Sequence, residues 1–260
     1  MQGSNPIFSN DERSKTVILV FRIYMVLLAF SIVSECVAYA NFRNQEYITS
    51  STRMLMLVVA LVGFVRAIGY IFLAVFFIMW MRRAYHNVHK AGSRLLRHSE
   101  GWAAGAWFVP FLNLSWPLQI MRDIWIETQN VFRRQDQPFE REEDNITGWW
   151  WAMFLVSGIV SEIGAFAINS QNFEMGYAFA AMADLGYVFA AVLAITMIQR
   201  ISRMETEMKE RADIYYAWLN QQYAQQYQQQ QDQQQQPQQQ ENFYKPSDQP
   251  SDSRPPDNFN

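Results

Sequence analysis

Four stretches of more than 20 predominantly apolar residues constrain this chain more than any other feature. They cover residues 16–40, 54–81, 149–169 and 176–198. At 1.5 Å per residue, each helix would exceed the roughly 30 Å hydrocarbon core of a bilayer. Inside lipid every backbone polar group needs a partner within the protein, which a helix supplies. We therefore predict an all-α integral membrane four-helix bundle.

The first stretch has one feature of a cleaved signal peptide, because Ala38-Tyr39-Ala40 has the small-x-small form of a cleavage site. Its apolar run, however, is about 25 residues long, whereas a signal core has about 7–15. Arg22 and Glu35 also interrupt it. The pattern favours a retained span.

Lys and Arg are unevenly distributed among the segments that connect the spans. The loop after the first span has only Arg43 and Arg53, and the loop 170–175 has none. Basic residues instead follow the second and fourth spans: Arg82, Arg83, Lys90, Arg94 and Arg97, then Arg200, Arg203, Lys209 and Arg211. Because short cytoplasmic loops are rich in Lys and Arg, we expect both termini to be cytoplasmic.

A further apolar segment within residues 101–134 is interrupted by Pro110, Asn113 and Pro117. Because proline removes a helical hydrogen bond, we expect a broken, re-entrant or interfacial hairpin rather than a fifth span. Ser115 suits the N-cap of an amphipathic helix that follows. Its apolar stripe consists of Ile120, Met121, Ile124, Trp125, Val131 and Phe132.

Cations and tryptophans gather around this hairpin, and both residue types favour the headgroup region of a bilayer. We expect the following residues to lie at the interface and contact anionic lipid headgroups: Arg82, Arg83, Lys90, Arg94, Arg97, Trp102, Trp107, Asn113, Trp116, Arg122 and Trp125. The alternative is that the basic run only sets the membrane topology.

Four ionisable residues inside the predicted spans form a candidate charge network: Glu35, Arg66, Glu162 and Asp184. A charge within a bilayer is costly, so each should face the bundle interior and find a partner. Small residues on the same helical faces favour close helix packing there. The network either fixes how the helices pack or carries a proton, ion or ligand.

The remaining segments have different compositions. Residues 1–15 form a short N-terminal segment, and residues 206–220 are expected to extend the last span as a cytoplasmic helix. Residues 221–260 should be disordered, because 15 of residues 221–240 are Gln. The helix and tail could bind a protein partner or a second copy of the chain. The net charge of −3 does not suggest nucleic-acid binding.

Neither a cofactor nor a metal is expected. Cys36 is the only cysteine, and no carboxylate is placed to orient His86 and His89 as ligands. A nucleophile–base pair is not recognisable either, which disfavours an enzyme. We expect a non-enzymatic protein that organises or senses at the cytoplasmic leaflet; the alternative is a small transporter or proton-conducting protein that uses the intramembrane carboxylates.

The central segment resembles domain-of-unknown-function family 4328, a family of bacterial multi-pass membrane proteins. The positions that carry this resemblance are Trp80, Arg83, Ala84, Asn87, Gly101, Trp102, Gly105, Trp107, Phe108, Pro110, Asn113, Leu114, Pro117, Arg122, Asp123, Ile124 and Trp125. The resemblance covers roughly residues 16–205 and departs in the Gln-rich tail. It implies a helical protein of the bacterial inner membrane and implies no activity.

Overall fold

The computed structural model describes residues 7–44, 49–91, 93, 95–133 and 143–243, and this part of the chain contains helices and no strands. The elements are α1 (Asp11–Asn44), α2 (Ser50–Lys90), α3 (Trp102–Gly105), the 3₁₀ helix η1 (Leu112–Leu114), α4 (Trp116–Arg133), α5 (Asn145–Asn169) and α6 (Phe173–Phe243). The predicted all-α class is confirmed. Four helices, α1, α2, α5 and α6, are long and apolar enough to cross a membrane.

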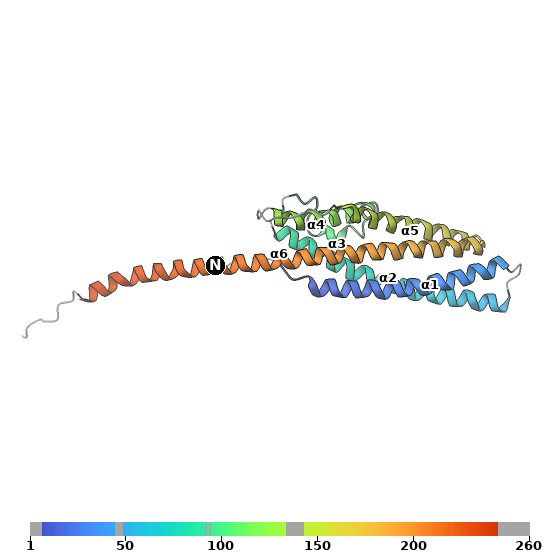
Figure 1. Cartoon of the computed structure of the whole chain (residues 1–260), viewed down its shortest axis with the longest axis horizontal. Helices are drawn as coiled ribbons and strands as arrows, with labels where there is room; N and C mark the ends of the chain where they lie inside the picture. Colours follow the sequence, from blue (N-terminus) through green and yellow to red (C-terminus); the bar gives the residue numbers. More distant parts are fainter. Residues whose placement is uncertain (1–6, 45–48, 92, 94, 134–142, 244–260) are drawn as a thin grey trace, which may run out of the picture. The chain divides into compact units, whose positions relative to one another are not determined.

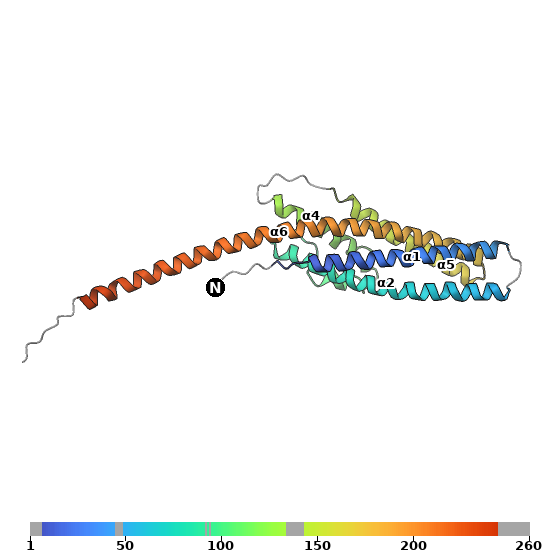
Figure 2. The same cartoon turned by 60° about the horizontal axis from the view of Figure 1, so that its bottom comes forward.

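The long helices form two antiparallel pairs, α1 with α2 and α5 with α6 (Figures 1 and 2). The α1–α2 and α5–α6 connections lie at the same end of the bundle, which we call the loop end. At the opposite end α1 begins, α2 ends and α4 packs beside the bundle. We call this the basic end, because α2 brings Arg82 and Arg83 there.

Helices α5 and α6 approach each other closely near the loop end. Only residues 170–172 connect them, and Gln171 adopts a positive φ of 62° that lets the chain reverse. A Cβ atom on Gly164 would lie 3.0 Å from the backbone oxygen of Gly176. Glycine therefore lets these two backbones touch, as small residues commonly do between membrane helices.

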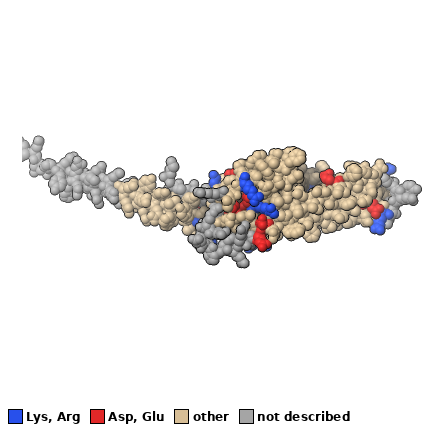
Figure 3. Space-filling view, turned by 90° about the horizontal axis from the view of Figure 1, so that it is seen from above, with Lys and Arg blue, Asp and Glu red and all other residues tan. Residues whose placement is uncertain are grey.

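The outer surface of the bundle is apolar. On α2 alone, large side chains with more than half of their surface exposed include Leu57, Leu61, Phe64, Ile71 and Phe72. Figure 3 shows broad uncharged stretches between groups of charged side chains. So large an apolar surface would be unfavourable in water and is what a lipid-facing surface requires. The chain is therefore a multi-pass membrane protein.

At the basic end, α4 is buried on both its apolar and its polar face. Its apolar residues Ile120, Met121, Ile124 and Trp125 are fully buried, and so is the polar residue Thr128. The expectation that Trp125 contacts headgroups is therefore wrong. A side chain on the apolar stripe of an amphipathic helix can pack against protein as well as lipid, and here the protein itself covers Trp125.

The chain divides into two compact units, one of residues 5–212 and one that contains residues 213–260 with residues 1–4. In the second unit α6 continues to Phe243, so residues 221–243 are helical where disorder was expected. Gln has a fairly high helix propensity, which a composition argument for disorder overlooks. Residues 244–260 lie outside the described residues.

Candidate functional site

Three of the four expected intramembrane charges meet inside the bundle. The Arg66 guanidinium on α2 forms an ion pair and hydrogen bond with Asp184 on α6, and its Nη1 lies 3.7 Å from Glu35 Oε1 on α1. Ser31 donates to Glu35 Oε1 at 3.0 Å and accepts from Arg66 at 3.4 Å. This intramembrane cluster therefore joins three of the four long helices.

Burial isolates this cluster from the surface. The side chains of Glu35 and Asp184 are only 6% and 1% exposed, and that of Arg66 is 25% exposed. Within the described residues, Glu35 Oε2 and Asp184 Oδ2 have no hydrogen-bond partner. Two carboxylates share one guanidinium, so the cluster has one acid more than it has bases.

Glu162 does not join this cluster, and the expectation that it would do so is wrong. Its side chain is exposed on α5. The face of α5 that packs on α6 contains Ser157 and Gly164, which approach Gly186 and Gly176. A helix turns about 100° per residue. Glu162 lies two positions before Gly164 and therefore points away from the side of α5 that carries Gly164.

An apolar cavity of about 80 Å³ lies between the cluster and the basic end. Tyr24, Tyr70 and Tyr187 line the part near the cluster, and Trp107 and Trp150 line the part near the basic end. Its remaining lining is apolar: Phe21, Leu73, Ala74, Phe77, Ile78, Phe154, Ala190 and Ala191. No carboxylate, histidine or cation in the described chain lines this space.

At the basic end, Asn87 holds the segment that precedes α1. Its amide exchanges two hydrogen bonds with the backbone of Phe8: Phe8 N donates to Oδ1 at 3.1 Å, and Nδ2 donates to Phe8 O at 2.8 Å. The same Nδ2 donates to Glu205 Oε1 on α6 at 2.9 Å. Asn10 Nδ2 donates to Glu205 Oε2 at 3.0 Å. We call this set the N-terminal latch.

Hydroxyl groups extend the latch toward the core. Trp80 Nε1 donates to Ser14 Oγ at 3.0 Å, and Ser202 Oγ donates to Ser14 Oγ at 2.6 Å. Trp80 is fully buried. The indole therefore joins α1 and α2 instead of reaching the headgroup region.

Glu205 lies seven residues beyond the apolar stretch that ends at 198, outside the span, and is 4% exposed. Burial raises the pKa of its carboxyl to about 7, although the hydrogen bonds from Asn10 and Asn87 oppose the increase. Asn10 Oδ1 is buried without a partner in the described chain. If the Asn10 amide flipped, protonated Glu205 could donate to that oxygen.

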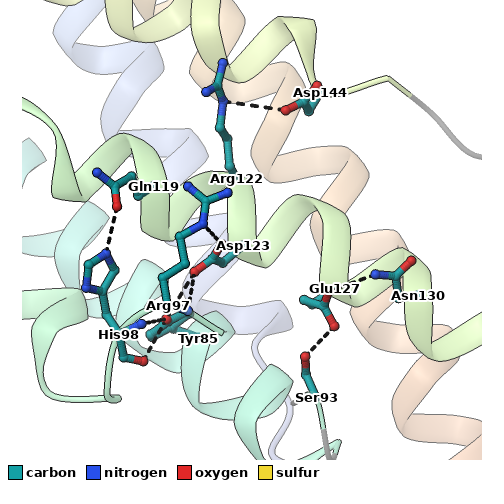
Figure 4. A network of polar contacts seen from close by, with 10 residues as sticks. All are labelled: Tyr85, Ser93, Arg97, His98, Gln119, Arg122, Asp123, Glu127, Asn130 and Asp144. Atoms are coloured by element: carbon teal, nitrogen blue, oxygen red, sulfur yellow. Dashed lines mark hydrogen bonds and ion pairs between the residues drawn. The ribbon is translucent and has the colours of Figure 1, made fainter. Parts of the chain in front are cut away.

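A second polar network fixes α4 to the segment after α2 (Figure 4). Asp123 accepts from Arg97 N at 3.1 Å and from Tyr85 Oη at 3.4 Å, and its carboxylate lies 3.3 Å from Arg97 Nε. Glu127 accepts from Ser93 and from Asn130. Burial raises the pKa of Asp123, and the bonds from Arg97 oppose this.

The hairpin before α4 presents apolar side chains outward. Phe108 and Phe111 are 77% and 84% exposed, and Leu114 is 54% exposed. Phe111 has a φ of 67°, a left-handed conformation that is unfavourable for a bulky residue. Trp151 Nε1 donates to Leu114 O at 2.9 Å and fixes this segment to α5.

The tryptophans of the hairpin are half-buried. Trp107 packs edge-on against Phe77 and Trp151, with centroid distances of 5.9 and 6.0 Å. Trp102 and Trp116 pack edge-on against each other at 4.7 Å. Their rings therefore join the hairpin to the bundle. The polar side chain of Asn113, which we expected at the interface, is exposed.

The expected headgroup cations occupy different surroundings. Arg82 and Lys90 are exposed, and Arg83 is half-buried. Arg97 and Arg122 lie near carboxylates, Arg122 Nε being 3.5 Å from Asp144 Oδ2. Arg94 lies outside the described residues.

Comparison with known families identifies most of the bundle. Residues 43–203 match the model of the family described as domain of unknown function (DUF4328). The chain belongs to this family. The match begins at residue 43, so it leaves out most of α1, which the expected range had included. No curated protein and no solved structure matches the chain.

Several residues that carry the family resemblance form or contact the N-terminal latch. Trp80, Arg83 and Asn87, which carried the resemblance, contact Ser14 and Phe8, which lie before the matched range. Glu205 was not among the site residues that the sequence predicted. An Asn among buried helix positions was the signal that could have indicated a polar partner.

Proposed function

We propose that this protein is a non-enzymatic membrane protein that organises or senses at the cytoplasmic leaflet of the bacterial inner membrane. The hairpin would insert its apolar side chains at the level of the headgroups, and nearby cations would bind anionic lipid. The observation that carries the proposal is the exposure of Phe108, Phe111 and Leu114 beside the end of a membrane-spanning bundle.

The backbone of the hairpin supports insertion over an accidental exposed patch. A phenylalanine with positive φ costs free energy, so the folded state needs a compensating interaction. Phe111 makes no aromatic contact with another ring in the described chain and is largely exposed. Burying an exposed phenylalanine in lipid contributes roughly 1.5–3 kcal/mol.

Both termini would lie in the cytoplasm. The support is the distribution of Lys and Arg, since Arg82, Arg83 and Lys90 lie at the basic end and the α5–α6 connection has no cation. In this orientation the hairpin and α4 face the cytoplasmic leaflet.

The test places a fluorophore on the hairpin. In a Cys36→Ser background, Phe111→Cys and Ser99→Cys would each be labelled and reconstituted with lipids that carry a quencher near the headgroup. We expect lipid to quench the label at 111 and aqueous iodide to quench the label at the exposed control 99. Equal iodide quenching at both positions would contradict insertion. If the label at 111 were quenched only by a quencher placed deep in the acyl chains, the hairpin would be re-entrant.

A second candidate function is proton or solute conduction through the intramembrane cluster. It is favoured by the unpartnered oxygens of Glu35 and Asp184. It is disfavoured by the apolar cavity, because the described residues that line it toward the basic end include no carboxylate or histidine. A proton flux in proteoliposomes that Asp184→Asn abolishes would favour conduction, and no flux would favour the first proposal.

The C-terminal unit would supply the partner interaction of an organising protein. Several large side chains of α6 in this unit are exposed: Ile214, Tyr215, Trp218, Tyr223 and Tyr227. Exposed aromatic residues commonly form the centres of protein interfaces. A protein that is retained by the whole chain and lost on truncation after residue 212 would support this role, and retention without the unit would contradict it.

A further inference from the structure

A cavity of about 470 Å³ opens at the basic end between the start of α1 and the end of α2. It is lined by Phe8, Arg13, Arg82, Arg83, His86 and Glu100. Half of these residues are arginines from two different helices. The lining also contains one carboxylate, so with a neutral histidine the formal charge around the cavity is positive.

The carboxylates closest in sequence to these arginines are already engaged. Glu100 Oε1 lies 2.8 Å from His86 Nδ1. At the start of α1, Asp11 and Glu12 pair with Lys15, at 2.6 and 3.5 Å. In the described chain none of the three arginines lining the cavity forms an ion pair.

Other contacts hold the guanidinium groups in place. Arg13 Nη1 donates to the carbonyl of Met79 at 3.2 Å, one turn before Arg82. The guanidinium of Arg83 lies over the ring of Phe8, 4.7 Å from its centroid. A carbonyl and an aromatic face orient these groups without neutralising their charge.

Arg83 also interacts electrostatically with the buried carboxyl of Glu205, although the two form no ion pair. The three arginines outnumber the carboxylates around them and repel one another, and an anion between them lowers that cost. The planar fork of arginine matches phosphate oxygens through two parallel hydrogen bonds. His86 supports a polar ligand, because its Nε2 is buried without a partner in the described chain.

The position of the cavity in the bilayer indicates where a phosphate would come from. Arg82 follows directly on the span 54–81, and Arg13 lies three positions before the span 16–40. Side chains at these positions lie at the level of lipid phosphates. We propose that this cavity binds a single phosphate group, that of an anionic phospholipid in the surrounding leaflet or of a soluble phosphate ester.

This proposal rests on the proposed function, since it requires the basic end to lie at a membrane surface, but it predicts something more specific. Diffuse attraction to an anionic leaflet treats the exposed cations of the basic end alike, at roughly 1 kcal/mol or about 5-fold in affinity for each. A phosphate site distinguishes Arg82 and Arg83, which line the cavity, from Lys90 on the same helix, which does not.

The experiment measures binding of phosphatidic acid and phosphatidylcholine to the whole protein in non-ionic detergent, by native mass spectrometry and by the thermal shift that each lipid causes. We expect phosphatidic acid to bind at least 10-fold more tightly than phosphatidylcholine. Arg82→Gln and Arg83→Gln should each weaken phosphatidic acid binding 10-fold or more, and the matched Lys90→Gln about 5-fold or less. Competition by millimolar inorganic phosphate would identify a soluble phosphate ester as the ligand, and its absence would identify the lipid.

The variants also test the geometry of the site. Arg82→Lys keeps the charge and removes the fork, so an intermediate loss is expected even if Arg83→Gln does not fold. Equal losses for the arginine and lysine variants would overturn the phosphate site and leave diffuse attraction intact. No preference for phosphatidic acid would overturn the site as well. Neither result changes the quenching expected at Phe111, so the two proposals can fail separately.

Discussion

Arg66 on α2 and Asp184 on α6 form an ion pair across 118 positions of the chain, and Glu35 on α1 lies on the other side of the same guanidinium. One cation therefore links the two helix pairs of the bundle. Its partners are buried, so removing it leaves two carboxylates without a counter-ion.

We expect Arg66→Ala to destabilise the bundle by about 3 kcal/mol, because breaking a buried pair strands the remaining charge. The thermal midpoint in detergent measures this effect. Arg22→Ala is the control, since Arg22 is an exposed cation of α1. If the cluster acts as a unit, Arg66→Ala combined with Asp184→Ala should cost less than the two single changes added together. Strict additivity would contradict the pairing.

The Glu205 carboxyl predicts a dependence of stability on pH. Its pKa in the folded chain is about 7, above the usual value of 4.5, so folding favours the protonated form. The stabilisation from the bound proton is complete below pH 4.5 and is lost as the pH rises through 7. The free energy of unfolding should therefore fall by about 3 kcal/mol over this pH range.

Chemical denaturation from pH 5 to pH 8 measures this dependence. Glu205→Gln should remove most of it, because an amide does not titrate and can donate to Asn10 after a flip. The nearby exposed acid provides the control, Glu207→Gln. The prediction fails if the Glu205 variant follows the same pH curve as the unchanged protein.

The close approach of α5 and α6 predicts intolerance of side chains at Gly164. A Cβ there would lie 3.0 Å from Gly176 O and 3.2 Å from Ala180 N, and backbone atoms cannot move aside cheaply. Gly164→Leu should cost roughly 1–3 kcal/mol by overpacking. Ala165→Leu places the same side chain on the exposed face of α5, and its thermal midpoint should be unchanged.

The orientation in the membrane predicts which positions react with a membrane-impermeant maleimide. In a Cys36→Ser background, Ser170→Cys at the loop end should be labelled in intact cells. Ser99→Cys at the basic end should be labelled only after the membrane is permeabilised. The opposite pattern would invert the proposed topology. Labelling of both positions in intact cells would place them on the same side of the membrane and would contradict the single span between them.

Hydrophobicity alone was enough to predict the four long helices, because a membrane requires apolar stretches of at least helical length. Which residue meets which was harder to predict. The pairing of Arg66 with Asp184 followed from the scarcity of charges inside the spans. The outward direction of Glu162 could not be predicted in this way. It depends on how α5 is rotated about its own axis, and the contact between Gly164 and Gly176 sets that rotation.

The basic end shows the same limit. Trp80 and Trp125 are of the residue type that is enriched at the headgroup level of a bilayer, yet both are fully buried. Their surroundings depend on how α4 packs, a tertiary relationship that helical periodicity does not contain. Glu205 was missed because its partners, Asn10 and Asn87, lie 195 and 118 positions away.

The N-terminal latch also has a consequence in time. Asn10 is synthesised 195 positions before Glu205. At roughly 5–20 residues per second, about 10 s or more separate the two during translation. The segment around Phe8 leaves the ribosome early, but its buried partner exists only after the last span has been made. The contact of the beginning of the chain with Glu205, like the contact of Arg66 with Asp184, can therefore form only after the fourth span has been synthesised.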